Sequence, residues 1–114
     1  MRVAVVGGPR TGKTTYAYNQ TLRPIYHTDE AMHLPWEEQP LVWIERLKDM
    51  PQFVIEGVQV ARCLRKGLEV DSVVLLDEPY EPLTPRQEGL RKGVLKVFNE
   101  WREAHPDVPV LEAR

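Results

Sequence analysis

The chain has 114 residues, of which 42% are hydrophobic and 28% are charged, and its formal net charge is −2 at pH 7. This length indicates one domain, 1–114, and the composition is typical of a globular protein. The small net charge gives no reason to expect nucleic acid as a partner, and no apolar run approaches the ~20 residues that span a bilayer. Met1–Val6 is too short for a secretory signal, and the single cysteine, Cys63, can form no intramolecular disulfide. We therefore expect a reducing, cytoplasmic location, with Cys63 as a small packed residue.

The first element is predicted at Val3–Val6, an apolar run whose β-branched residues are typical of a strand buried on both faces of a parallel sheet. A glycine-rich loop follows it directly. The next helix is expected to begin near Lys13 and to end by Leu22, because Pro24 disfavours helical geometry in the residue before it. A short second strand is predicted at Ile25–Thr28.

The middle of the chain begins with His33–Gln39, which is predicted as an irregular loop between two prolines. Pro40 suits the first position of a helix that covers Leu41–Met50. A third strand is predicted at Phe53–Ile55, followed by a short helix at Ala61–Leu68. The buried stripe of the first of these helices is predicted at apolar positions three residues apart, namely Leu41, Ile44, Leu47 and Met50.

The last third of the chain begins with Val73–Leu76, the most clearly buried of the predicted strands. Thr84 is predicted to cap a helix that runs to Ala104, because Pro85 falls in its first turn and Gln87 lies where a capping box requires it. This helix contains Gly89 and Gly93, which cost stability in a helix, and we expect close packing against the sheet to compensate. Its buried stripe is predicted at Leu90, Val94, Val97, Phe98 and Trp101.

A weak fifth strand is predicted at Val108–Leu111. Strands that alternate with helices predict an α/β fold of three layers, in which a parallel sheet carries helices on both faces. Ligands of such sheets bind at the carboxyl ends of the strands. We therefore expect the loop after the first strand to lie near Asp29, Glu56 and Asp77, which follow three other strands.

The loop Gly7–Thr14 carries the motif G-x-x-x-x-G-K-[ST] between a predicted buried strand and a predicted helix, the context that this motif requires. Its glycines let successive backbone N–H groups point at phosphate oxygens, and the following helix adds the positive end of its dipole. Lys13 is expected to reach the β- and γ-phosphates, and the Thr14 hydroxyl to bind Mg²⁺. We therefore predict a site for ATP, or another nucleoside triphosphate, formed by Gly7, Gly8, Pro9, Arg10, Thr11, Gly12, Lys13, Thr14 and Thr15.

These features resemble the P-loop NTPase superfamily and, within it, small kinases such as adenylate, gluconate and shikimate kinases. The resemblance is carried by Gly7–Thr14, by Asp29 after the second strand, and by Phe53–Gly57, which is similar to the hydrophobic-Asp-Gly segment at the end of those kinases' third strand. It implies a five-stranded parallel sheet in the order 2-3-1-4-5. The chain departs from the pattern at Glu56, where aspartate is usual, and lacks a segment similar to the long arginine-bearing lid and the final helix.

The resemblance implies a kinase that transfers the γ-phosphoryl group of ATP to a small acceptor such as a nucleotide. In the similar kinases, an acid at the position of Asp29 contacts the acceptor, and an arginine in the stretch that holds Arg86 neutralises the transferring group. Lys13, Asp29 and Arg86 are therefore the expected catalytic residues. One predicted helix has a basic face, which comprises Arg62, Arg65 and Lys66. This face either binds an anionic acceptor or is only a solvated surface.

The carboxylate that serves Mg²⁺ has two candidates, because two predicted strands end in acidic residues. Glu56 ends the third strand, which in the similar kinases carries the metal-side acid beside the loop strand. The segment Val73–Glu78 is also similar to the Leu-Leu-Asp-Glu-Pro run of transporter ATPases, in which Asp77 would serve the metal and Glu78 would activate water. The metal ligands are thus expected to be Thr14 with Glu56 or Asp77. The alternative functions are an ATPase or nucleotide-dependent switch that acts through a protein partner, and a module that only binds nucleotide.

Overall fold

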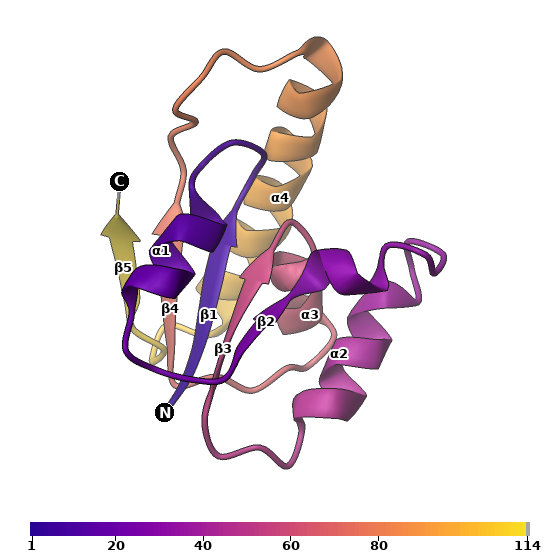
Figure 1. The fold of residues 1–114 in the computed structure, drawn as a ribbon. Helices are drawn as coiled ribbons and strands as arrows, with labels where there is room; N and C mark the ends of the chain where they lie inside the picture. Colours follow the sequence, from indigo (N-terminus) through magenta and orange to yellow (C-terminus); the bar gives the residue numbers. More distant parts are fainter. Residues whose placement is uncertain (114) are drawn as a thin grey trace.

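The computed structural model describes residues 1–113 and contains one parallel sheet with helices on both faces (Figure 1). Arg114, the last residue of the predicted domain, lies outside the described residues. The strands are β1 (Arg2–Gly7), β2 (Ile25–His27), β3 (Phe53–Gly57), β4 (Ser72–Leu76) and β5 (Val110–Ala113). The helices are α1 (Lys13–Asn19), the 3₁₀ helix η1 (Thr28–Ala31), α2 (Gln39–Leu47), α3 (Val60–Arg65) and α4 (Pro85–Ala104).

The five strands lie in the order β2-β3-β1-β4-β5, and each pair of neighbours is parallel, which confirms the predicted class and order. The centre of the sheet is β1, whose Ala4, Val5 and Val6 have no exposed surface. The register pairs Val5 with Glu56 of β3 and Gly7 with Leu76 of β4. Since all strands end at one edge, the acids that close β3 and β4 lie on either side of the chain as it leaves β1.

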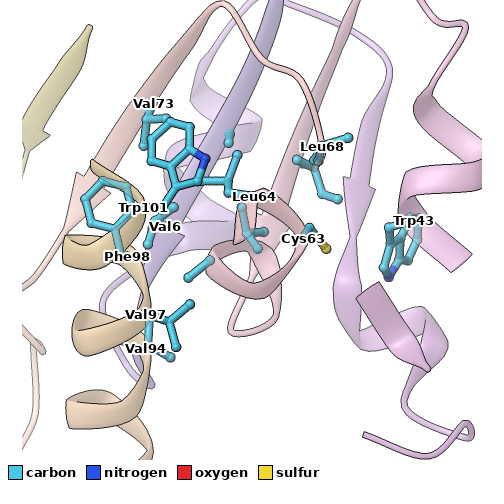
Figure 2. Packing of buried hydrophobic residues seen from close by; sticks show 14 of the residues in the cluster. Val6, Trp43, Cys63, Leu64, Leu68, Val73, Val94, Val97, Phe98 and Trp101 are labelled. Atoms are coloured by element: carbon cyan, nitrogen blue, oxygen red, sulfur yellow. The ribbon is translucent and has the colours of Figure 1, made fainter. Parts of the chain in front are cut away.

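Side chains alternate between two hydrophobic clusters, as the strand period of two requires. The larger cluster lies between the sheet and the helices α2, α3 and α4, and the smaller one lies under α1. Figure 2 shows Phe98 and Trp101 of α4 on the side that faces Val73 and the α3 residue Leu64. Cys63 has no exposed surface in the larger cluster, which confirms that it is a packed residue.

Helix α4 begins as the sequence predicts. The Thr84 hydroxyl accepts a hydrogen bond from the Gln87 N–H at 3.2 Å, and the Gln87 side chain accepts one from the Thr84 N–H at 3.0 Å. Four residues of the predicted stripe are buried and Leu90 is partly buried. In the part of the chain that the structure describes, neither this helix nor any other is long and apolar enough to cross a membrane.

Two packing predictions are wrong. Leu41 is 54% exposed and Trp43 is buried in its place, because residues two apart differ by about 200° around the helix axis and so face nearly opposite sides. Leu47 is buried as predicted. A Cβ atom added to Gly89 would meet nothing within 4 Å, since the first turns of α4 rise beyond the sheet edge (Figure 1). At Gly93 the nearest atom would be an Arg62 nitrogen at 3.6 Å, an ordinary contact, so neither glycine packs tightly against the sheet.

Several element boundaries also differ from the predicted ones. Thr28 begins η1 instead of ending the second strand, and α3 covers Val60–Arg65 in place of Ala61–Leu68. The helix predicted to reach Met50 ends at Leu47, and the fifth strand begins at Val110, after the expected start. Shifts of this kind are common, because helix ends fray and their last turn is often irregular.

Candidate functional site

The loop after β1 turns the chain from the sheet into α1. Gly12 ends the loop with a φ of 81°, a left-handed conformation that side chains with a Cβ rarely adopt. A Cβ on Gly7 would lie 2.6 Å from both the Leu76 carbonyl oxygen and Thr11 Oγ1, so the loop packs directly on the end of β4. The geometry therefore requires both glycines of the motif.

Lys13, the first residue of α1, extends back over the loop. Its Nζ atom and Thr11 Oγ1 both donate hydrogen bonds to the Gly8 carbonyl oxygen, at 2.5 and 3.0 Å. Burial lowers the pKa of the Lys13 ammonium, while the charges of Glu56 and Asp29 act in the opposite direction. The lysine, the loop and these two acids thus lie within electrostatic reach of one another, as the sequence predicts for the strand ends.

Glu56 is a carboxylate with 2% exposure at the end of β3. Its Oε2 atom accepts a hydrogen bond from Thr14 Oγ1 at 3.1 Å, and its Oε1 atom lies 2.9 Å from His27 Nδ1. Because the Thr14 hydroxyl has one proton and two lone pairs, donation to Glu56 leaves its lone pairs free for another ligand. A hard cation such as Mg²⁺ prefers such oxygen atoms, so the residues fit this ion.

A hollow of about 500 Å³ runs along the loop and the first turns of α1. Tyr80 reaches it from the segment between β4 and α4, where the Tyr80 N–H donates to the Arg10 carbonyl oxygen at 2.8 Å. Arg10 Nη1 also pairs with Glu81 of that segment at 2.5 Å. The residues that line the hollow are Arg10, Thr11, Gly12, Lys13, Thr14, Thr15, Tyr16, Asn19, Leu76 and Tyr80.

The acids that follow β4 have different surroundings. Asp77 Oδ1 pairs with Arg91 Nη2 at 2.9 Å, and Arg91 Nε donates to the Asp77 carbonyl oxygen at 3.3 Å. Arg91 also packs against the loop, since a Cβ on Gly8 would lie 3.0 Å from Arg91 Cβ. Asp77 and Glu78 line a separate hollow beside β5, together with Glu112. The structure therefore brings Glu56, and not Asp77, into contact with Thr14.

The other predicted residues lie away from the contact between Thr14 and Glu56. Asp29 is exposed on η1, and within residues 1–113 its carboxylate makes no hydrogen bond. Arg86 is exposed in the first turn of α4 and is not among the residues that line the loop hollow. Arg62 of α3 lies with its guanidinium over the Trp36 ring, 4.8 Å from the ring centre, and its buried Nη1 atom has no hydrogen-bond partner within residues 1–113. Arg65, the last residue of α3, and Lys66, which follows it, are exposed.

His27 and Tyr80 are not among the predicted site residues. Arg91 belongs to the basic stretch in which Arg86 is the expected catalytic residue, and the structure places Arg91, not Arg86, against the loop. The strand order holds a signal for His27, because adjacent parallel strands β2 and β3 pair His27 with Glu56 in register. No comparable signal marks Tyr80, and the contacts of both Tyr80 and Arg91 depend on how the segment before α4 and α4 itself pack on the loop.

A metal ion at Thr14 and Glu56 would need ligands from water or a bound molecule. Within residues 1–113, no group of three or more His, Cys, Asp and Glu side chains is placed to hold one. Mg²⁺ is commonly bound in this way, by few protein groups together with water and phosphate oxygens. The sequence matches no protein-family model and is not significantly similar to any curated protein.

Proposed function

We propose that this chain is a small P-loop kinase that binds Mg²⁺-ATP at Gly7–Thr14 and transfers the γ-phosphoryl group to a small acceptor. One observation carries the proposal. At the carboxyl edge of the sheet, Thr14 hydrogen-bonds the buried Glu56 carboxylate, and Lys13 lies within electrostatic reach of both Glu56 and Asp29. A cation, a metal-compatible oxygen pair and a second carboxylate thus surround one end of the loop.

Each group has a role in the proposal. The Lys13 ammonium neutralises charge on the β- and γ-phosphates, and Thr14 with Glu56 holds the hydrated metal, which offsets the charge of the phosphates. The hollow beside α1 is open enough to hold the rest of the nucleotide, with the exposed Tyr80 ring at its rim as a stacking surface. Because phosphoryl transfer needs little covalent help, such positioning supplies most of the catalysis.

The acceptor is proposed to lie on the β2–β3 side of the loop. Asp29 is accessible there and accepts the proton of the acceptor hydroxyl. Arg62 supports an anionic acceptor, because within the described chain no acid forms an ion pair with it and its buried Nη1 atom has no hydrogen-bond partner. Arg86 can neutralise the transferring group only if the segment before α4 closes over the hollow, whereas Arg10 already lines it.

The ATPase alternative assigns the chemistry to Asp77 and Glu78. It has less support, since Asp77 is paired with Arg91 and both acids line the hollow beside β5. The kinase and ATPase proposals differ in one measurable respect. A kinase releases ADP in proportion to acceptor, whereas an ATPase releases it without one.

The first test is nucleotide binding to a Lys13→Met variant. Methionine keeps the apolar stem and removes the charge that the proposal places on the phosphates, so we expect Mg²⁺-ATP affinity to fall by about tenfold or more. Calorimetry on the wild type, Lys13→Met and Lys96→Ala provides the comparison, because Lys96 is an exposed lysine of α4. Equal affinities in all three proteins would refute the phosphate-binding role of the loop.

A further inference from the structure

A chain of polar contacts leads from the protein surface to the Thr14 hydroxyl. The Tyr18 hydroxyl on α1 lies 3.2 Å from His27 Nε2, and His27 Nδ1 lies 2.9 Å from Glu56 Oε1. The opposite oxygen of Glu56 accepts the Thr14 hydrogen bond at 3.1 Å. This series of contacts therefore links α1, β2 and β3 through side chains alone.

For an ionised Glu56 and a neutral His27 ring, the donors and acceptors in these contacts define one arrangement of protons. An ionised carboxylate only accepts, so the Nδ1 atom of His27 carries the proton that faces Glu56. The Nε2 atom of the neutral ring is then an acceptor, and the Tyr18 O–H is its donor. The tilted contact between the two rings, with centres 5.5 Å apart, keeps the hydroxyl beside Nε2.

Glu56 depends on this arrangement because of its length and its burial. A glutamate has one more rotatable bond than the aspartate that is usual at this point, so its carboxylate needs an additional constraint to face one direction. The Glu56 side chain is 3% exposed, so water contributes little to holding Oε1. His27, whose side chain is 20% exposed, is the group that contacts that oxygen and leaves Oε2 directed at Thr14.

We propose that His27 is a positioning residue that fixes the Glu56 carboxylate toward Thr14, and that Tyr18 fixes the tautomer of His27. The consequence for metal binding rests on the proposed function, in which Thr14 and Glu56 hold the hydrated Mg²⁺ of the nucleotide. Partners of this kind, which orient a metal-side group without touching the ion, typically change metal affinity by about 10–100-fold.

The first experiment examines the protein without nucleotide or metal. Long-range proton–nitrogen NMR correlations of ¹⁵N-labelled protein, recorded at mildly alkaline pH, distinguish the two neutral tautomers of a histidine ring. We expect His27 to carry its proton on Nδ1, and the exposed His33 serves as an internal reference. A His27 ring protonated on Nε2 would overturn the inference, whatever the protein binds.

The second experiment measures ATP binding by calorimetry across a series of Mg²⁺ concentrations. Mg²⁺ is expected to increase ATP affinity up to a maximum, and the measured quantity is the Mg²⁺ concentration at half of that increase. We expect His27→Leu to raise this concentration by about tenfold or more. His27→Asn places an amide N–H close to the position of Nδ1, so it should restore most of the wild-type dependence. Tyr18→Phe should produce a smaller increase than His27→Leu, and the control His33→Leu should produce none.

The outcomes separate this inference from the proposed function. A wild type whose ATP binding is independent of Mg²⁺ overturns the function and, with it, the role of His27 in metal binding. Wild-type dependence that His27→Leu leaves unchanged overturns the inference alone, as does a His27→Asn protein that behaves like the leucine variant. Thermal unfolding checks that each variant is folded. If His27→Leu does not fold, the inference is decided by comparing the Mg²⁺ dependence of Tyr18→Phe and His27→Asn with that of the wild type.

Discussion

The two strands beside β1 both lead into acidic residues, yet the two sides of the loop have different properties. On the β3 side, Glu56 is buried, contacts Thr14 and His27, and lies near Asp29 and Lys13. On the β4 side, the Asp77 side chain is 48% exposed and is paired with Arg91. A buried carboxylate that pairs with no lysine or arginine side chain at close range is costly, so the burial of Glu56 favours a binding role at this strand end.

The difference shows why an acidic residue at a strand end is weak evidence of a metal site. Asp77 follows an apolar strand next to β1, as a metal-side acid would, but Arg91 from α4 satisfies its charge. Glu56 has hydrogen-bond donors and, at longer range, the Lys13 charge. The partner of each acid, and not its place along the chain, separates a candidate ligand from a structural ion pair.

The largest expected effect concerns turnover, and it tests which side of the loop carries the chemistry. Asp29→Asn removes the proposed proton acceptor with little change in shape, so acceptor-dependent turnover should fall about 10²–10⁴-fold while ATP affinity stays nearly unchanged. Glu78→Gln should change turnover by less than about tenfold. Coupled ADP release across nucleoside monophosphates, sugars and small anionic acceptors measures both variants.

The opposite result would transfer the chemistry to the β4 side. If Glu78 is essential for ADP release and no acceptor stimulates it, the ATPase assignment replaces the kinase one. Basal ADP release by Glu78→Gln gives this answer even before an acceptor is known.

The next effect concerns the metal and compares the two strand ends directly. Glu56→Gln removes the negative charge and leaves one acceptor oxygen, so an amide donor faces either His27 or Thr14, and the Mg²⁺ dependence of ATP binding should weaken by about tenfold or more. Asp77→Asn should weaken it by less than about threefold, because Asp77 does not contact Thr14. Calorimetric titrations of ATP at several Mg²⁺ concentrations decide the point, and a larger effect of Asp77→Asn would contradict the assignment of Glu56.

The smallest effect tests whether the pair on the β4 side is only structural. Arg91→Met removes the ion pairs with Asp77 and Glu88 while its apolar stem still covers Gly8. Because all three charged groups are partly exposed, we expect a loss of about 0.5–1 kcal/mol in the free energy of unfolding, measured with urea. The Mg²⁺ dependence of ATP binding should not change, and a change would mean that Asp77 takes part in the site.

Much of the architecture follows from local sequence signals. Apolar runs between glycine and proline boundaries locate the strands, and the Thr84–Gln87 capping box starts α4 where predicted. These signals work because strand burial, caps and tight turns depend on residues close together in sequence. The motif glycines are of the same kind, since the left-handed Gly12 and the tight packing at Gly7 need residues without a Cβ.

The tertiary structure alone decided which side chains meet. Leu41 and Trp43 are both apolar residues of α2, and only packing against Tyr26 and the sheet selected Trp43 for the core. The pairing of Asp77 with Arg91, and the contact of His27 with Glu56, join residues 14 and 29 positions apart. Such contacts depend on the relative placement of whole elements, which local propensity does not specify. The sequence therefore determined the fold class and the loop, whereas the environment of each carboxylate was decided by the packing of the elements around it.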